Sequence, residues 1–141
     1  MRIFFAALLA VLLLPLMGPS AKAAVEARVQ ISTQKMVVYV DGQPAKEWTV
    51  STGRRGYTTP TGDYKAQWLS AQHRSKKYKN APMPHSIFFT GGYAVHGTTE
   101  VARLGKPASH GCVRLAPANA KELFALVREH GLQSSRIVIT Q

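Results

Sequence analysis

The apolar residues of this chain fall mainly into short runs closed by turn-forming residues, and this spacing constrains the fold more than any other feature. Apolar and polar side chains alternate in residues 28–32 and 47–50, whereas MVVYV at 36–40 is apolar throughout. Alternation predicts a strand with one buried face, and an unbroken apolar run predicts a strand covered on both faces. Further strands are expected at 64–68, 87–89, 93–95 and 136–140. The spacing therefore predicts a mostly β domain.

Only one segment has the periodicity of a helix. Its apolar residues repeat at helical spacing, at Ala120, Leu123, Phe124 and Val127. Pro117 suits the first turn of this helix, and Gly131 suits its end. The expected fold is a β-rich domain with one clear α-helix packed on the sheet.

Three connections interrupt the strand pattern. Asp41-Gly42 is a turn signal and predicts a hairpin between 36–40 and 47–50, with a loop longer than two residues. Residues 51–62 are rich in glycine, threonine and proline, and residues 70–84 are basic with little apolar content. Long segments of this kind serve as lids or as ordinary solvated loops. A basic lid would suit a substrate that carries carboxylates.

The first 23 residues are organised like a secretory signal peptide. Met1-Arg2 gives a positive start, residues 3–17 are almost entirely apolar, and Ala21-Lys22-Ala23 offers a cleavage site. The apolar run contains Pro15 and is shorter than the roughly 20 residues of a membrane span, which disfavours an uncleaved anchor. We therefore expect a signal peptide at 1–23, a single domain at 24–141, and export to the periplasm or cell envelope.

Charge narrows the expected partners. The chain carries 18 Lys and Arg against 7 Asp and Glu, and loss of Arg2 and Lys22 would lower the net charge from +11 to +9. In a cytoplasmic protein this excess would suggest nucleic acid. For an exported protein the available polyanions are the cell wall, anionic lipid and lipopolysaccharide, so no nucleic-acid partner is expected. The charge is equally consistent with simple solubility and loose retention at the envelope.

Cys112 is the only cysteine, within SHGCVRL at 109–115. In an exported chain a single cysteine indicates an intermolecular disulfide or a free thiol. Structural free cysteines are usually buried in apolar surroundings and inert. The polar, glycine-bearing approach to Cys112 favours instead a thiol presented at a surface.

A nucleophilic thiol requires a base, and two of the five histidines are placed for that role. His96 follows an apolar strand and precedes Gly97-Thr98, so it is expected at a strand tip. His110 lies two residues before Cys112. Carboxylates are scarce, and Glu100 is the only one near His96 in sequence. A backbone carbonyl is therefore a reasonable group to orient the imidazole.

These residues resemble a known family. His96-Gly97-Thr98 together with SHGCVRL is similar to the signature of the L,D-transpeptidases, the YkuD-type catalytic domain. STGRRGYTTPTGDY at 51–64 and MPHSIFFTGGYAVHGT at 83–98 also resemble segments of that family. The resemblance extends over about residues 29–140, and its motifs are specific in combination.

The resemblance implies a β-rich fold with the active site at strand ends under a lid. It implies a bacterial envelope enzyme, without cofactor or metal, that acts on peptidoglycan stem peptides through a cysteine thioester. Its carried-over roles are Cys112 as nucleophile, His96 as base, the Gly97 carbonyl as orienting group, and Ser109, His110 and Gly111 as pocket residues. Arg114 would bind a substrate carboxylate or form a structural ion pair.

Several alternatives stay open at this stage. A sortase-like transpeptidase also uses His, Cys and Arg, but its arginine lies well downstream of the cysteine. His96, His110 and Cys112 are all possible zinc ligands, although no fourth ligand is evident. A catalytically silent wall-binding module would share the fold. The acyl acceptor could be a stem peptide, a lysine of an envelope lipoprotein, or water, which would make the protein a carboxypeptidase. We expect a monomer.

Overall fold

A computed structural model describes residues 23–141. The segment predicted as a signal peptide falls outside the described residues, apart from Ala23. The strands are β1 (Val25–Gln30), β2 (Lys35–Val40), β3 (Gln43–Thr49), β4 (Gly62–Lys65), β5 (Trp68–Arg74), β6 (Pro82–Thr90), β7 (Tyr93–Gly97), β8 (Val113–Leu115) and β9 (Ser135–Thr140). The helix α1 spans Pro117–His130, and two short 3₁₀ turns lie at Val101–Arg103 and Leu132–Ser134.

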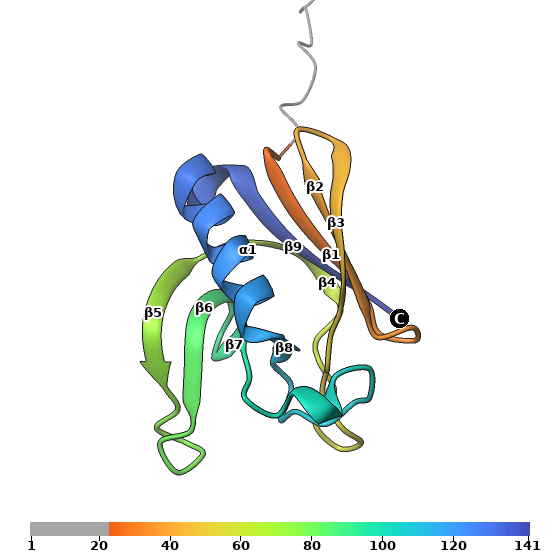
Figure 1. The fold of residues 1–141 in the computed structure, drawn as a ribbon, viewed down its shortest axis with the longest axis vertical. Helices are drawn as coiled ribbons and strands as arrows, with labels where there is room; N and C mark the ends of the chain where they lie inside the picture. The colour runs from red at the N-terminus through yellow and green to blue at the C-terminus, as the bar shows by residue number, and fades with distance from the viewer. Residues whose placement is uncertain (1–22) are drawn as a thin grey trace, which may run out of the picture.

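The strands form two sheets. In Figure 1, β1 to β3 of the first sheet lie at the upper right, β5 to β8 of the second lie at the lower left, and α1 lies between them. The first sheet has the order β3-β2-β1-β9-β4. In it β1 pairs antiparallel with β2 and parallel with β9, so both ends of the described chain meet at its centre. The second sheet has the order β5-β6-β7-β8, in which the pairing of β7 with β8 is parallel. The prediction of a mostly β fold is confirmed.

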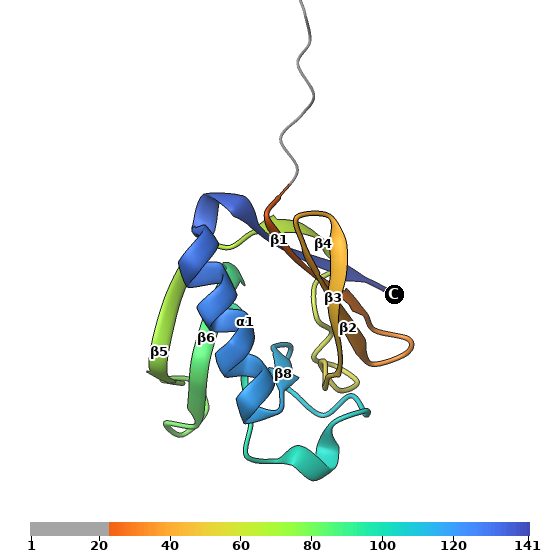
Figure 2. The same ribbon diagram turned by 45° about the horizontal axis from the view of Figure 1, so that its top comes forward.

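The core lies between the two sheets and α1. Figure 2 shows α1 between the strands β5 and β6 of the second sheet and the strands β1 to β3 of the first. The predicted apolar stripe is buried, since Ala120, Leu123, Phe124 and Val127 are its buried residues. Gly131 ends the helix at φ +92°, a backbone conformation that suits glycine. No helix within residues 23–141 is long and apolar enough to cross a membrane.

Two predictions for the first sheet are wrong. The β2–β3 connection is only Asp41-Gly42, both at positive φ, and not a longer loop. Such a pair matches the right-handed twist of a two-residue hairpin, so β3 begins earlier than its apolar residues suggest. The run at 36–40 has one buried face rather than two. Met36 and Val38 are fully buried, while the side chains between and after them are partly exposed.

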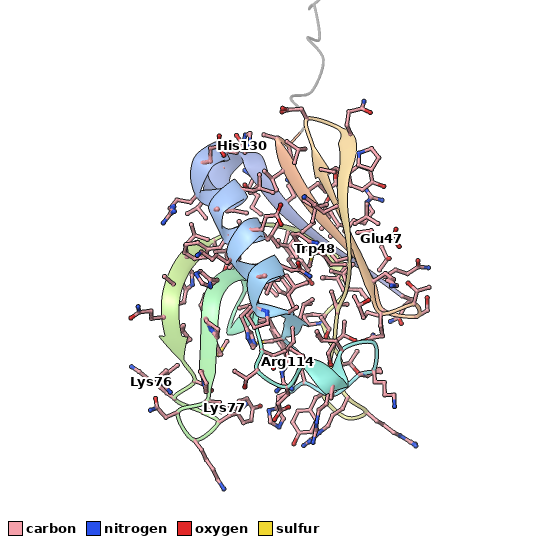
Figure 3. The ribbon with its side chains drawn as sticks, in the orientation of Figure 1. Glu47, Trp48, Lys76, Lys77, Arg114 and His130 are labelled. Carbon is pink, nitrogen blue, oxygen red and sulfur yellow. The ribbon has the colours of Figure 1, made fainter. Side chains whose placement is uncertain are left out.

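The segment around Tyr64–Arg74 also differs from prediction. The expected strand at 64–68 is two strands in different sheets, because β4 pairs with β9 and β5 pairs with β6. Residues 70–84 are not a long loop, since most of them belong to the β5–β6 hairpin, whose tip is residues 75–81. Lys76 and Lys77 lie at this tip, as Figure 3 shows. Strand β8, which was not predicted, is three residues long and follows Cys112 directly.

Candidate active site

Strands β7 and β8 bring the predicted histidine and cysteine together. Their parallel register pairs Val95 with Val113 and His96 with Arg114. Val95 and Val113 belong to the buried core. Because side chains alternate along a strand, His96, Arg114 and the preceding Cys112 lie on the opposite face of this sheet. The sequence motifs around positions 96 and 112 therefore meet through strand pairing.

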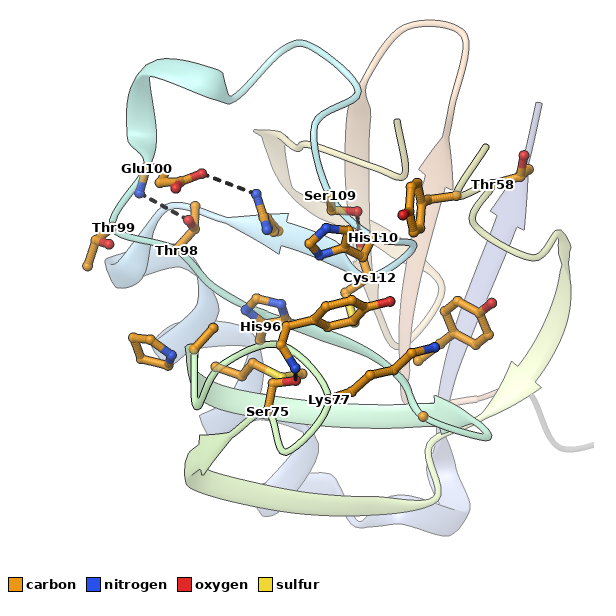
Figure 4. A pocket seen from close by; sticks show the side chains of 18 of the residues that line it. Thr58, Ser75, Lys77, His96, Thr98, Thr99, Glu100, Ser109, His110 and Cys112 are labelled. Atoms are coloured by element: carbon orange, nitrogen blue, oxygen red, sulfur yellow. Dashed lines mark hydrogen bonds and ion pairs between the residues drawn. The ribbon is translucent and has the colours of Figure 1, made fainter. Parts of the chain in front are cut away.

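This face forms the floor of a cleft of about 650 Å³. The cleft is lined by residues 56–58, the tip of the β5–β6 hairpin, β7 with the residues that follow it, and the segment from Ser109 to Arg114. Figure 4 shows His96, His110 and Cys112 together at its centre. Of the predicted site residues, Gly97 and Gly111 alone do not line the cleft, and the backbone carbonyl of each takes part in a hydrogen bond.

The imidazole of His96 is held by the residue that follows it. Nδ1 lies 2.7 Å from the carbonyl oxygen of Gly97. A carbonyl only accepts hydrogen bonds, so Nδ1 carries the proton and Nε2 keeps its lone pair. The side chain of Ala120 and the ring of Pro84 lie 3.3 Å and 3.2 Å from where a Cβ of Gly97 would be. Glycine thus allows close packing against the start of α1.

Burial favours the neutral forms of His96 and Cys112. The pKa of His96 is lowered to about 4, chiefly because the ring is buried, with the charge of Arg114 lowering it further. Burial raises the pKa of the Cys112 thiol, against smaller opposing effects from the backbone of Ala94 and from Arg114. Near neutral pH the site therefore holds a thiol beside a neutral imidazole. Such a pair forms its nucleophile by proton transfer during attack rather than as a standing thiolate.

The turn that presents Cys112 is closed by the hydroxyl of Ser109. Its Oγ donates to the carbonyl of Cys112 at 2.6 Å and accepts from the N–H of Gly111 at 3.0 Å. Ser109 is fully buried. Gly111 has φ +119°, and a Cβ there would collide with the ring of Tyr93. Serine and glycine at these two positions fix the shape of the turn.

A second loop braces this turn from outside. The hydroxyl of Thr59 donates to the carbonyl of Gly111 at 2.8 Å and accepts from the N–H of Gly53 at 2.9 Å. The N–H of Arg54 donates to the carbonyl of Ser109 at 2.9 Å. Thr59 is 1% exposed. Thr59 lies in the threonine- and proline-rich segment at 51–62, but the sequence alone does not single it out, because its role depends on a contact between distant residues.

His110 lies between two tyrosines at the mouth of the cleft. Its ring stacks on Tyr78 with a centroid distance of 4.0 Å and an angle of 12° between the planes. Tyr57 meets it edge-on at 5.0 Å. Burial and the nearby charges of Arg54, Arg114 and Lys77 lower the pKa of His110. The stack connects the β5–β6 hairpin to the turn of Cys112, so the basic segment does reach the site, although as a hairpin tip.

Arg114 lines the same cleft as Cys112 and is also ion-paired. Its guanidinium is 3.3 Å from Glu100, whose carboxylate also lies 3.6 Å from Arg103. The side chain of Arg114 is 19% exposed, against 61% for Arg103. The backbone N–H of Glu100 in turn donates to the hydroxyl of Thr98. Arg114 therefore combines an ion pair with a position in the cleft wall.

Metal ligation receives no support from this geometry. Within residues 23–141, no group of three or more His, Cys, Asp or Glu side chains could hold a metal ion. His96, His110 and Cys112 share the cleft without forming such a group.

The sequence and fold place the chain in a family. The family model of the L,D-transpeptidase catalytic domain (YkuD) matches residues 24–139. The chain therefore belongs to the L,D-transpeptidase catalytic-domain family, which is a family of acyltransferases. No curated protein matches the chain at a significant level.

Solved structures of L,D-transpeptidases share the fold. One from Mycobacterium smegmatis has a TM-score of 0.75 at 22% identity, covering 84% of this chain and 59% of that one. Another from Stackebrandtia nassauensis has a TM-score of 0.74 at 30% identity, covering 86% of this chain and 57% of that one. L,D-transpeptidase 3 from Mycobacterium tuberculosis, solved with a faropenem-derived adduct, has a TM-score of 0.74 at 18% identity, covering 84% of this chain and 61% of that one. The present chain thus spans less than two thirds of these structures.

Proposed function

We propose that this protein is a cysteine-dependent L,D-transpeptidase that acts on peptidoglycan stem peptides. The observation that carries the proposal is the pairing of β7 with β8, which sets Cys112 and an oriented His96 on one face of a cleft. Family membership supports the same chemistry. Because the chain spans only part of its solved relatives, the activity of the whole protein is part of the proposal.

The first half-reaction forms a thioester. The sulfur of Cys112 attacks the carbonyl carbon at the L-centre of the third stem residue, and its proton passes to Nε2 of His96. The tetrahedral intermediate then collapses by breaking the C–N bond to the terminal D-alanine, whose amine takes the proton from His96. The hydrogen bond to Gly97 keeps the imidazole in the tautomer that this transfer needs.

The turn before β8 leaves a donor for the oxyanion. The N–H of Gly111 is already bound by the hydroxyl of Ser109, and the N–H of Cys112 lies outside that ring of hydrogen bonds. In our proposal the Cys112 N–H donates to the oxygen that becomes negative during attack. Loss of one such donor typically lowers the rate about 10²–10³-fold. The Ser109 ring then serves to hold this donor and the thiol in a fixed relation.

The second half-reaction transfers the acyl group. An acceptor amine attacks the thioester carbonyl, its proton passes to His96, and the sulfur leaves and recovers a proton. A stem-peptide amine gives a cross-link, a lysine of an envelope lipoprotein gives anchoring, and water gives hydrolysis. We propose an amine acceptor and location in the cell envelope, with cleavage of the signal peptide after Ala23. The N-terminal sequence of the exported protein tests that cleavage site.

β-Lactams provide a test of the thioester chemistry that does not depend on the acceptor. A relative of the same fold has been solved with a faropenem-derived adduct. We expect faropenem to acylate the purified protein once, on the peptide that contains Cys112, and to leave Cys112→Ala unmodified, as judged by mass spectrometry. Absence of an adduct on a folded protein whose thiol still reacts with iodoacetamide would favour the silent wall-binding module.

A further inference from the structure

One large aromatic side chain is exposed away from the cleft. Among residues 23–141, the exposed large apolar side chains are Tyr57, Trp68, Tyr93 and Val101. Tyr57 and Tyr93 line the cleft, whereas Trp68 does not. Trp68 is 44% exposed and begins β5, the outermost strand of its sheet. An exposed tryptophan on an edge strand is a candidate contact site for a ligand or a partner.

The ring of Trp68 is held flat by its neighbours. It stacks on Phe88 with centroids 3.8 Å apart and an angle of 1° between the planes. His73 packs edge-on against both rings, at 5.6 Å from Trp68 and 4.9 Å from Phe88. Stacking on Phe88 thus covers one face of the indole, while the residue as a whole remains exposed. The result is a rigid aromatic surface that loses little freedom when a ligand stacks on it.

Trp68 lies in the same row of the second sheet as Cys112, with the buried side chains of Phe88 and Ala94 between them. Trp68 pairs with Phe88, and Phe88 pairs with Ala94. The parallel register of β7 and β8 then sets Cys112 beside Ala94, in the same row across the sheet. Phe88, Ala94 and Met83 form one apolar cluster against which Cys112 packs. Three steps of about 4.8 Å between strands separate the Cys112 and Trp68 backbones by about 14 Å.

We propose that Trp68 is a sugar subsite, which stacks on the hexosamine that bears the stem peptide of the acyl donor. The proposal rests on the proposed function. From the attacked carbonyl, three amino-acid residues and a lactyl link lead back to the sugar, and at about 3.5 Å each they extend about 14 Å. The span of the substrate therefore matches the span of the sheet row. The apolar C–H face of a pyranose ring complements a flat indole surface.

The test compares the binding of two ligands to Cys112→Ala, which cannot form the thioester. The ligands are the disaccharide-tetrapeptide and the free tetrapeptide, and calorimetry gives their affinities. Stacking that buries about 60 Å² of apolar surface corresponds to about tenfold in affinity. We expect this advantage for the disaccharide-tetrapeptide, and we expect it to vanish when Trp68→Leu is added. Leucine keeps an apolar cover over Phe88 but has no flat face.

Fluorescence localises the contact directly, because the chain has two tryptophans. Trp48 lies on β3 in the other sheet, partly buried against the core. Trp48→Phe leaves Trp68 as the only reporter, and Trp68→Phe leaves Trp48. The disaccharide without peptide should change the emission of Trp48→Phe and not that of Trp68→Phe. Equal emission changes in the two variants, or no change in either, would overturn the sugar subsite. It would also be overturned if the protein dimerised and the substitution Trp68→Leu abolished the dimer.

The outcomes separate this inference from the proposed function. A Cys112 adduct without any affinity advantage for the disaccharide would refute the sugar subsite and leave the thioester chemistry standing. Sugar-dependent binding without an adduct would support the subsite and refute the enzyme.

Discussion

The hydroxyl of Thr59 and the carbonyl of Gly111 are joined by a 2.8 Å hydrogen bond across 52 positions of sequence. The bond ties the threonine-rich loop after β3 to the turn that presents Cys112. Since Thr59 also accepts from the N–H of Gly53, one buried hydroxyl satisfies two backbone groups on different segments. The geometry of the turn before Cys112 therefore depends on a residue outside the SHGCVRL motif.

Replacing Thr59 by valine should damage both stability and activity. Valine fills the same volume but leaves the Gly53 N–H and the Gly111 carbonyl without partners, at a cost of about 2 kcal/mol in the free energy of unfolding. We expect the rate of acylation to fall about tenfold or more, because the turn loses its brace. Urea unfolding and acylation kinetics measure the two effects. Thr61→Val is the matched control, because Thr61 is exposed, and it should behave as the wild type.

The pH dependence of acylation should extend further into acid than an ordinary histidine allows. His96 accepts a proton only when neutral, and its pKa is lowered to about 4. The active form is therefore present above about pH 4 and is lost as the pH falls through that value. Because the pKa of the Cys112 thiol is raised, the rate should stay level through neutral pH. Faropenem acylation between pH 3 and 9 checks this, and an acid limb near the usual value of about 6.5 would contradict it.

Arg114 should tune the reacting pair electrostatically. Its charge lowers the pKa of both His96 and Cys112. In Arg114→Gln the acid limb should therefore move to higher pH, and alkylation of the thiol by iodoacetamide should require more alkaline conditions. We expect acylation to slow about tenfold.

Arg103 provides the control for Arg114, because it pairs with the same carboxylate of Glu100 but does not line the cleft. Arg103→Gln should leave both pH profiles where they are. Identical effects from the two substitutions would show that only the ion pair matters, and the electrostatic role of Arg114 would be refuted.

Lysines at the hairpin tip offer a test of carboxylate recognition. Lys77 lines the cleft, with its ammonium 5.4 Å from the centroid of the Tyr78 ring. Neighbouring Lys76 is exposed and is not part of the lining. Lys77→Ala should raise the apparent KM for stem peptides about two- to fivefold, as expected for an exposed ion pair, and the effect should shrink at high salt. Lys76→Ala should change KM little, and equal effects would mean that only net charge counts.

How far the sequence predicts this molecule depends on the range of the contacts involved. The stripe from Ala120 to Val127 and the end of α1 at Gly131 are local patterns, and both are confirmed. The break between β4 and β5 was missed, because which sheet a strand joins depends on partners far along the chain. Strand β8 was missed because three residues carry almost no periodic signal.

The residues of the candidate site also differ in whether local sequence predicts them. Its motifs around His96 and Cys112 are contiguous and were found. The roles of Thr59 and Tyr78 were not predicted, and neither was the ion pair of Glu100 with Arg114, because all three depend on contacts with distant residues. Thr59 does lie in the threonine- and proline-rich segment at 51–62, whose composition is visible in the sequence.

Mass spectrometry can show whether Cys112 carries the acyl group. The purified protein is incubated with a disaccharide-tetrapeptide, beside Cys112→Ala. We expect an adduct on the Cys112 peptide that has lost D-alanine, and no adduct in the variant. A dimer product would identify an amine as the acceptor, and a tripeptide product would identify water. A folded protein with a reactive thiol that forms no adduct and releases no D-alanine would contradict the proposal that Cys112 carries the acyl group.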